Sequence, residues 1–175
     1  MSVYVRKLVS PTEPILFDEM PKFDFENPPM DPVTIAKHLA ETMILHGGLG
    51  LACNQIGLPY RACSIQSDPV IVMFNPHITA MSDDFTILDE GCLSFPNFIV
   101  KVKRPNWVRV RYTEPNGNVV TNKFHGMTSR AICHEIDHLN GIVFWQRANR
   151  IHLDRAKKNA KLAARRQKSL LNTQR

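Results

Sequence analysis

The chain has 175 residues, of which 43% are hydrophobic, and this fits one domain of ordinary size with a real core. No apolar run is long enough to span a bilayer, and residues 1–10 lack the apolar segment of a secretory signal, so we expect a cytoplasmic protein without a membrane partner. The net charge of +6 is uneven, because residues 152–175 carry eight Lys or Arg and one acid, whereas residues 1–151 carry 14 basic and 15 acidic residues.

The first predicted helix follows a proline-rich stretch, residues 10–32, which we expect to be an ordered loop. Asp31-Pro32 is typical of a helix start, with Asp31 as the N-cap and Pro32 in the first helical position. The helix should end at Gly47-Gly48. Four residues follow the helical period and should face the core: Ile35, Leu39, Thr42 and Met43.

Short β runs fill residues 61–124. Residues 70–74 are apolar and stop at Asn75-Pro76, which predicts the end of a strand there. Residues 107–112 and 119–124 predict the two strands of a hairpin. Asn116-Gly117 between them predicts a type I′ turn, because that turn needs positive φ at both central residues.

Two further helices are predicted after the strands. One runs from about residue 128 to residue 139, with Gly141 just beyond it as a C-terminal cap. The other covers about residues 153–170 and carries most of the positive charge. Helix, then antiparallel strands, then helices predicts an α+β fold.

Residues 134–138 read H-E-x-x-H on the first of these two helices. Helical spacing puts His134 and His138 on one face, one turn apart, so both imidazoles can reach one metal ion. Glu135 lies beside that face, where it can reach a water on the metal. We therefore expect a metal-dependent hydrolase with antiparallel sheets packed around this central metal-binding helix.

A catalytic metal needs a third protein ligand and one open position. The extended form of the motif would place a His at position 144, which is Phe144, and no Glu follows Glu135. The third ligand should therefore come from upstream. Cys92 is the best candidate, because Gly91 before it lets the backbone approach another element. The other three cysteines are expected to pack as small buried hydrophobes.

The chain resembles the peptide deformylases, which carry the motifs G-x-G-x-A-A-x-Q, E-G-C-L-S and H-E-x-D-H in this order. Here they read as residues 48–55, 90–94 and 134–138, with one departure at Cys53, where Ala is usual. The resemblance implies removal of the formyl group from N-terminal formyl-methionine of new polypeptides. It also implies Fe(II) as the metal in the cell, with Zn(II), Ni(II) or Co(II) as alternatives.

Residue roles follow from the same resemblance. The metal ligands are Cys92, His134 and His138, and Glu135 is the general acid–base. The Gln55 side chain and the Leu93 backbone N–H stabilise the developing oxyanion. Six residues are implied to bind the substrate, either by pairing with the substrate backbone or by lining the pocket for its methionine side chain: Leu49, Gly50, Leu88, Gly91, Met127 and Ala131. Structural support comes from Arg104 paired with Asp137, and from Glu90.

The basic tail suggests a second partner. We expect residues 1–152 to form the catalytic domain, with residues 153–175 as an appended basic helix that contacts the ribosome through clustered Lys and Arg. Two alternatives remain at this point. The H-E-x-x-H motif alone permits a metallopeptidase of another class, and the tail alone permits a ribosome- or RNA-binding module.

Overall fold

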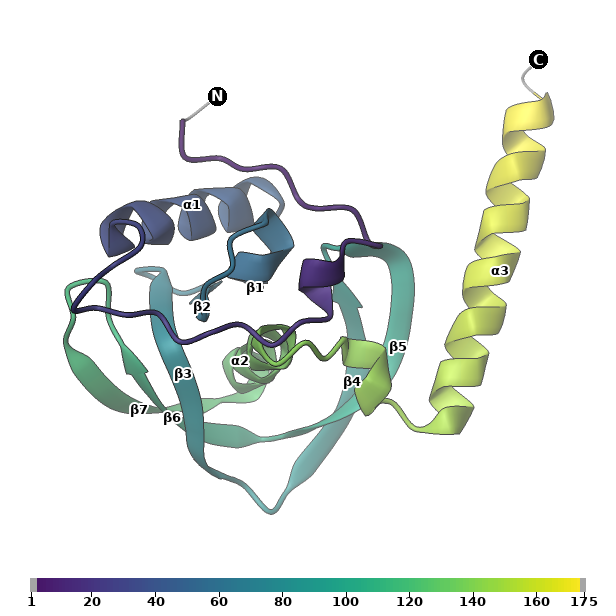
Figure 1. Cartoon of the computed structure of the whole chain (residues 1–175). Helices are drawn as coiled ribbons and strands as arrows, with labels where there is room; N and C mark the ends of the chain where they lie inside the picture. Colours follow the sequence, from purple (N-terminus) through teal and green to yellow (C-terminus); the bar gives the residue numbers. More distant parts are fainter. Residues whose placement is uncertain (1–2, 174–175) are drawn as a thin grey trace.

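The computed structural model describes residues 3–173 and has an α+β arrangement, with α2 at its centre (Figure 1). One antiparallel sheet has the order β1-β2-β3-β6-β7, and β4 pairs with β5 in a separate hairpin. Within residues 3–173, no helix is long and apolar enough to cross a membrane. The strands are β1 (Gly50–Ala52), β2 (Ala62–Ile65), β3 (Ile71–Met81), β4 (Phe85–Cys92), β5 (Phe95–Pro105), β6 (Trp107–Thr113) and β7 (Val119–His125). The helices are α1 (Pro32–Leu45), α2 (Gly126–Leu139) and α3 (Arg150–Thr173), with short 3-10 turns η1 (Pro14–Leu16), η2 (Cys53–Ile56) and η3 (Phe144–Arg147).

The start and the buried face of α1 confirm the sequence prediction. The Asp31 side chain accepts hydrogen bonds from the backbone N–H groups of Val33 and Thr34, which caps the helix. The four residues at the predicted core positions are the buried residues of the helix. The three apolar ones, Ile35, Leu39 and Met43, pack with β1 and β2 in one core cluster.

The strand predicted to stop at Asn75 continues to Met81, so this boundary was wrong. Asn75 has φ 51°, and the register with β6 shifts between Phe74 and His77, which marks a β-bulge. The Asn75 side chain accepts from the Phe23 N–H at 2.8 Å and donates to the Phe23 carbonyl at 2.9 Å. Pro76 has no backbone N–H and cannot donate a hydrogen bond to the neighbouring strand. The bulge accommodates the proline, so the strand continues beyond it.

The hairpin of β6 and β7 is confirmed, but its predicted turn type was wrong. Thr113 and Val119 form the last strand pair, so five residues make the loop. Gly117 has φ 89°, whereas Asn116 is not among the residues with positive φ. A type I′ turn closes a two-residue loop with positive φ at both positions, and neither condition is met.

The core places one face of α2 against the five-stranded sheet. Ile132, Ile136 and Leu139 pack with Val108 and Val110 on the inner sheet face. A smaller cluster joins β5 and η3 to the start of α3 through Ala156, which is 6% exposed. Further along α3, Leu162 is exposed, and the side chain of Leu170 lies outside the described part. The other face of α2, which does not pack on the five-stranded sheet, contacts the β4–β5 hairpin and the β1–η2 segment.

Candidate metal site and substrate pocket

The end of β4 and one face of α2 bring together Cys92, His134 and His138. Their ligand atoms lie within 4.8 Å of one another, and the Cys92 Sγ is 3.1 Å from the His138 Nε2. The two imidazole rings are 5.0 Å apart between centroids, as expected for residues one helical turn apart. The fold therefore unites the upstream cysteine with the two histidines of the motif.

This donor set fits a divalent metal ion. One thiol and two imidazoles suit zinc or ferrous iron, and three protein ligands leave a position open. Burial lowers the pKa of His138 well below its ordinary value, so the ring is neutral, which is the form that binds metals. Among the described residues, the buried Nδ1 of His138 has no hydrogen-bond partner.

Glu135 lies deep beside this cluster and is 3% exposed. Its Oε2 has no partner within residues 3–173, although a buried carboxylate normally needs one. Burial raises the pKa of Glu135 to about 7, so the group can accept and release a proton near neutral pH. A Cβ atom at Gly50 would come within 2.5 Å of the Glu135 Oε1, so only glycine leaves room for this carboxylate.

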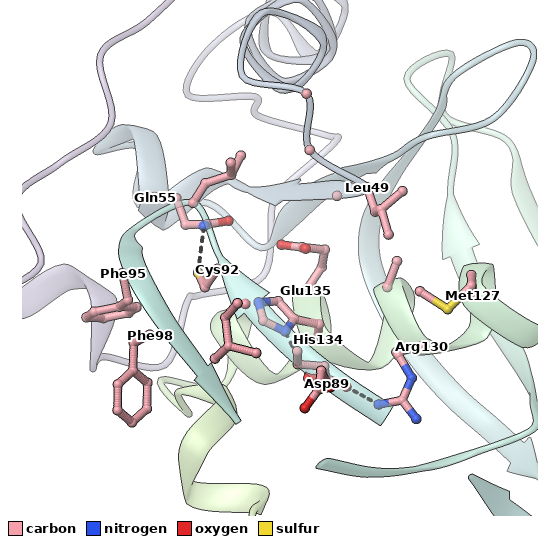
Figure 2. A pocket seen from close by; sticks show the side chains of 18 of the residues that line it. Leu49, Gln55, Asp89, Cys92, Phe95, Phe98, Met127, Arg130, His134 and Glu135 are labelled. Carbon is pink, nitrogen blue, oxygen red and sulfur yellow. Dashed lines mark hydrogen bonds and ion pairs between the residues drawn. The ribbon is translucent and has the colours of Figure 1, made fainter. Parts of the chain in front are cut away.

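Gln55 of η2 points its amide nitrogen at the same site (Figure 2). Its Oε1 accepts from the Ala52 N–H at 2.8 Å, which fixes the orientation of the amide. The Nε2 donates to Ser94 Oγ at 3.1 Å and to Cys92 Sγ at 3.4 Å. An oriented donor of this kind can stabilise negative charge that develops next to the Cys92, His134 and His138 cluster.

Glu90 is the centre of a buried charge network behind His134. Arg104 donates to both of its carboxylate oxygens, at 3.0 and 3.1 Å, and Arg130 donates to one of them at 2.5 Å. Burial alone would raise the pKa of Glu90, but hydrogen bonds from His134 and Arg104 outweigh it and lower this pKa to about 2. The His134 Nδ1 lies 3.2 Å from the ionised Glu90, which leaves the Nε2 of that ring for a metal.

A cavity of about 380 Å³ opens beside Glu135 and His134. Five of the six predicted substrate-binding residues line it: Leu49, Gly50, Gly91, Met127 and Ala131. The sixth, Leu88, lies outside it in an adjoining hollow. Met127 and Arg130 line both hollows, and Arg130 donates to Glu90 and to the Thr86 carbonyl, so these two side chains lie between the hollows.

A family model described as polypeptide deformylase matches residues 5–154. The chain belongs to the polypeptide deformylase family. Membership of this family confirms the predicted activity: the protein is a metal-dependent hydrolase that removes formyl groups. Neither a metallopeptidase of another class nor a ribosome- or RNA-binding module without enzyme activity gains support from these matches.

Individual deformylases agree with this assignment. The peptide deformylase of Caldanaerobacter subterraneus is 42% identical over 113 residues, which cover 64% of this chain and 70% of that protein. A Synechococcus elongatus deformylase solved with actinonin has a TM-score of 0.82 at 29% identity and covers 92% of this chain and 88% of its own. A class I type b deformylase from Acinetobacter baumannii, solved with Met-Ala-Ser, has a TM-score of 0.76 at 30% identity. The match covers 84% of this chain and 99% of that chain.

Several residues that line the cavity of this deformylase were missed from the sequence. Arg130 carried a usable signal, because it lies one helical turn before His134 and the same spacing places it on the same face. No comparable sequence signal marked Asp89, Phe98 or Ile99. They reach the cavity only because β4 pairs with β5 in one particular register.

Proposed function

We propose that Cys92, His134 and His138 hold the catalytic metal and that Glu135 transfers the protons of the deformylation reaction. The observation that carries this proposal is the convergence of the three ligand atoms within 4.8 Å, beside the buried Glu135 carboxylate, whose Oε2 has no partner among the described residues. The proposal makes α2 the metal-binding helix at the centre of the fold.

The metal, when bound, supplies Lewis-acid activation of water and of the formyl oxygen. We propose Fe(II) as the cellular ion, with Zn(II), Ni(II) or Co(II) able to occupy the same ligands, because a thiolate with two imidazoles accepts each of them. Metal analysis of protein prepared without air tests the identity. A zinc-filled, fully active preparation containing no iron would contradict it.

The substrate is the N-terminal formyl-methionine of a nascent polypeptide. Its main chain pairs as an added strand with the backbone of Leu49, Gly50 and Gly91. Its methionine side chain fills the cavity beside Met127 and Ala131. The Met-Ala-Ser tripeptide held by the Acinetobacter relative supports a ligand of this length and chemistry.

The residues around the cavity then divide the reaction between them. Glu135 accepts a proton from the water that attacks the formyl carbon. As the carbonyl oxygen gains negative charge, the Gln55 Nε2 and the Leu93 backbone N–H donate to it. Glu135 passes its proton to the leaving amine, and the products are formate and a free methionine N-terminus.

The test separates metal binding from proton transfer. Formate release from formyl-Met-Ala-Ser and metal content are measured on the wild type, Glu135→Gln and Cys92→Ala. Glu135→Gln should keep its metal and lose activity by about 10²–10⁴-fold, the usual contribution of a general acid–base group. Cys92→Ala should lose the metal itself. A full equivalent of metal in Cys92→Ala would remove this cysteine from the ligand set.

A further inference from the structure

The solvent-facing side of β3, β6 and β7 is basic. These three strands contain no Asp or Glu, yet they expose His77, Arg109, Arg111 and Lys123. We call these four residues, together with Thr121, the outer sheet face. The opposite side of the same strands packs on α2, so this charge lies on the surface and has no role in the core.

Two cations lie directly across from each other on the outer sheet face, because Arg109 pairs in register with Lys123. Arg111 lies on the same face, with His77 across from it. Like-charged pairs weaken a sheet unless something neutralises them. Within residues 3–173, no carboxylate lies within ion-pair distance of Arg109, Arg111 or Lys123. Carboxylates of the described residues therefore do not neutralise these three cations, and their charge is available to an anionic partner.

The basic surface continues into a hollow of about 650 Å³ at one end of the sheet. Lys22, Arg61 and Arg111 line this hollow together with His77, against a single acid, Glu19. Arg61 donates to the Leu139 carbonyl, which also keeps its guanidinium fixed at the hollow. A row of cations along a sheet and into a groove is complementary to a chain of phosphates.

We propose that the outer sheet face and this hollow bind the phosphate backbone of RNA. The contact should be independent of base sequence, because neither aromatic side chain beside it is open for stacking. The Lys123 Nζ lies 3.9 Å from the centre of the Trp107 ring, and Tyr112, which lines the hollow, is only 5% exposed. Phosphate contacts by Lys and Arg fix position on a nucleic acid and carry no sequence information.

RNA at this face would leave the active site open. None of the residues that line the catalytic cavity belongs to β3, β6 or β7. α2 separates the sheet from the β4–β5 hairpin, and the turn of β6 and β7 lies on the opposite side of the body from α3 (Figure 1). The face is therefore a contact distinct from both the substrate pocket and the basic tail.

The test uses full-length protein and a fluorescently labelled single-stranded RNA, with affinity measured across a salt series. Arg109→Gln/Lys123→Gln should flatten the plot of log affinity against log salt by about 1.4, since each lost phosphate contact removes about 0.7. The matched control is Lys7→Gln/Lys37→Gln, which removes the same charge from exposed positions elsewhere and should leave the slope unchanged. Both variants should release formate at the wild-type rate.

A charge reversal separates binding from folding. Arg109→Glu places opposite charges across the strands, so its melting temperature should equal or exceed that of the wild type. Its RNA affinity should nevertheless fall, on the order of tenfold at low salt. Unchanged RNA affinity in both variants would overturn the proposal. So would binding of anionic lipid vesicles or of a polyglutamate peptide through this face with no binding of RNA.

Discussion

The amide group of Gln55 is held at its oxygen by the Ala52 N–H and offers its nitrogen to Ser94 and Cys92. Because the oxygen is occupied, the nitrogen cannot rotate away from the site. Gln55→Ala removes this donor and should lower turnover by about 10²–10³, or ~2.7–4 kcal/mol of transition-state stabilisation. Steady-state formate release measures the loss, and metal content should not change. Near-normal turnover would exclude Gln55 from the mechanism.

Gly50 makes room for the Glu135 carboxylate. A Cβ at this position would lie 2.5–2.8 Å from three atoms of the Glu135 side chain. Gly50→Ala should therefore displace Glu135 and lower activity by roughly 10²-fold, the usual effect of a misplacement of about 1 Å.

Gly91→Ala is the control for that variant. A Cβ at Gly91 would meet only Ile99 and Phe98, at 3.8 and 3.9 Å, which is ordinary contact. Its turnover should fall far less, and both variants should retain their metal. If the two substitutions had equal effects, the steric role of Gly50 would be wrong.

For individual residues of the site, helical spacing was enough to predict that His134 and His138 share one face and that Glu135 lies next to it. Chain order excluded a downstream ligand and directed attention to Cys92. The cavity wall could not be predicted in the same way. Met127 and Arg130 lie between Leu88 and the cavity, and the Arg130 side chain connects α2 with β4 over 40 residues of sequence.

Between elements, Arg104 of β5 connects β4 to α2. It donates to Glu90 and, at 2.6 Å, to Asp137, and its side chain is 6% exposed. Arg104→Met would leave Glu90 and Asp137 without this buried partner and should cost about 3–5 kcal/mol of unfolding free energy. Urea unfolding at fixed metal occupancy measures this cost.

Arg147 provides the comparison for that measurement. It also pairs with Asp137, but its side chain is 46% exposed. Arg147→Met should cost no more than about 1 kcal/mol, because solvent screens an exposed pair. Similar losses for the two variants would show that burial of Arg104 is not what makes its ion pairs important.

The accuracy of the predicted elements depends on whether their signals are local. The cap and the apolar period of α1 lie within its own residues, and the structure follows both. The continuation of β3 through Asn75 depends on Phe23, 52 residues away, so residues 70–76 alone could not reveal it. The five-residue loop after Thr113 likewise depends on where the register of β6 with β7 ends.

Across the whole molecule, α3 extends from the body beside β5 (Figure 1). We propose that this appended basic helix docks on the ribosome and places the cavity near its substrate. Deletion of residues 161–175 keeps the buried Ala156 and should leave hydrolysis of formyl-Met-Ala-Ser nearly intact. Salt-sensitive co-sedimentation with ribosomes should fall sharply, because five of the eight basic residues of the tail are removed.

A weakened but measurable interaction after this deletion is compatible with the outer sheet face as a second contact. Combining the deletion with Arg109→Gln/Lys123→Gln should then abolish co-sedimentation. If the deletion alone has no effect at any salt concentration, the tail is not a docking element.

The proposed metal ligands come from two elements that are joined only by tertiary packing. Cys92 ends β4, whereas His134 and His138 belong to α2, and the Asn54 amide of η2 holds the His138 carbonyl at 2.7 Å. An unfolded chain has no preformed site of this kind, so metal binding favours the native state. At a free metal concentration 100 times the Kd, this gain is about 2.7 kcal/mol, a large share of the stability of an ordinary domain. The supply of metal in the cell thus helps to set how much of this protein stays folded and escapes proteolysis, before it sets how fast the folded enzyme works.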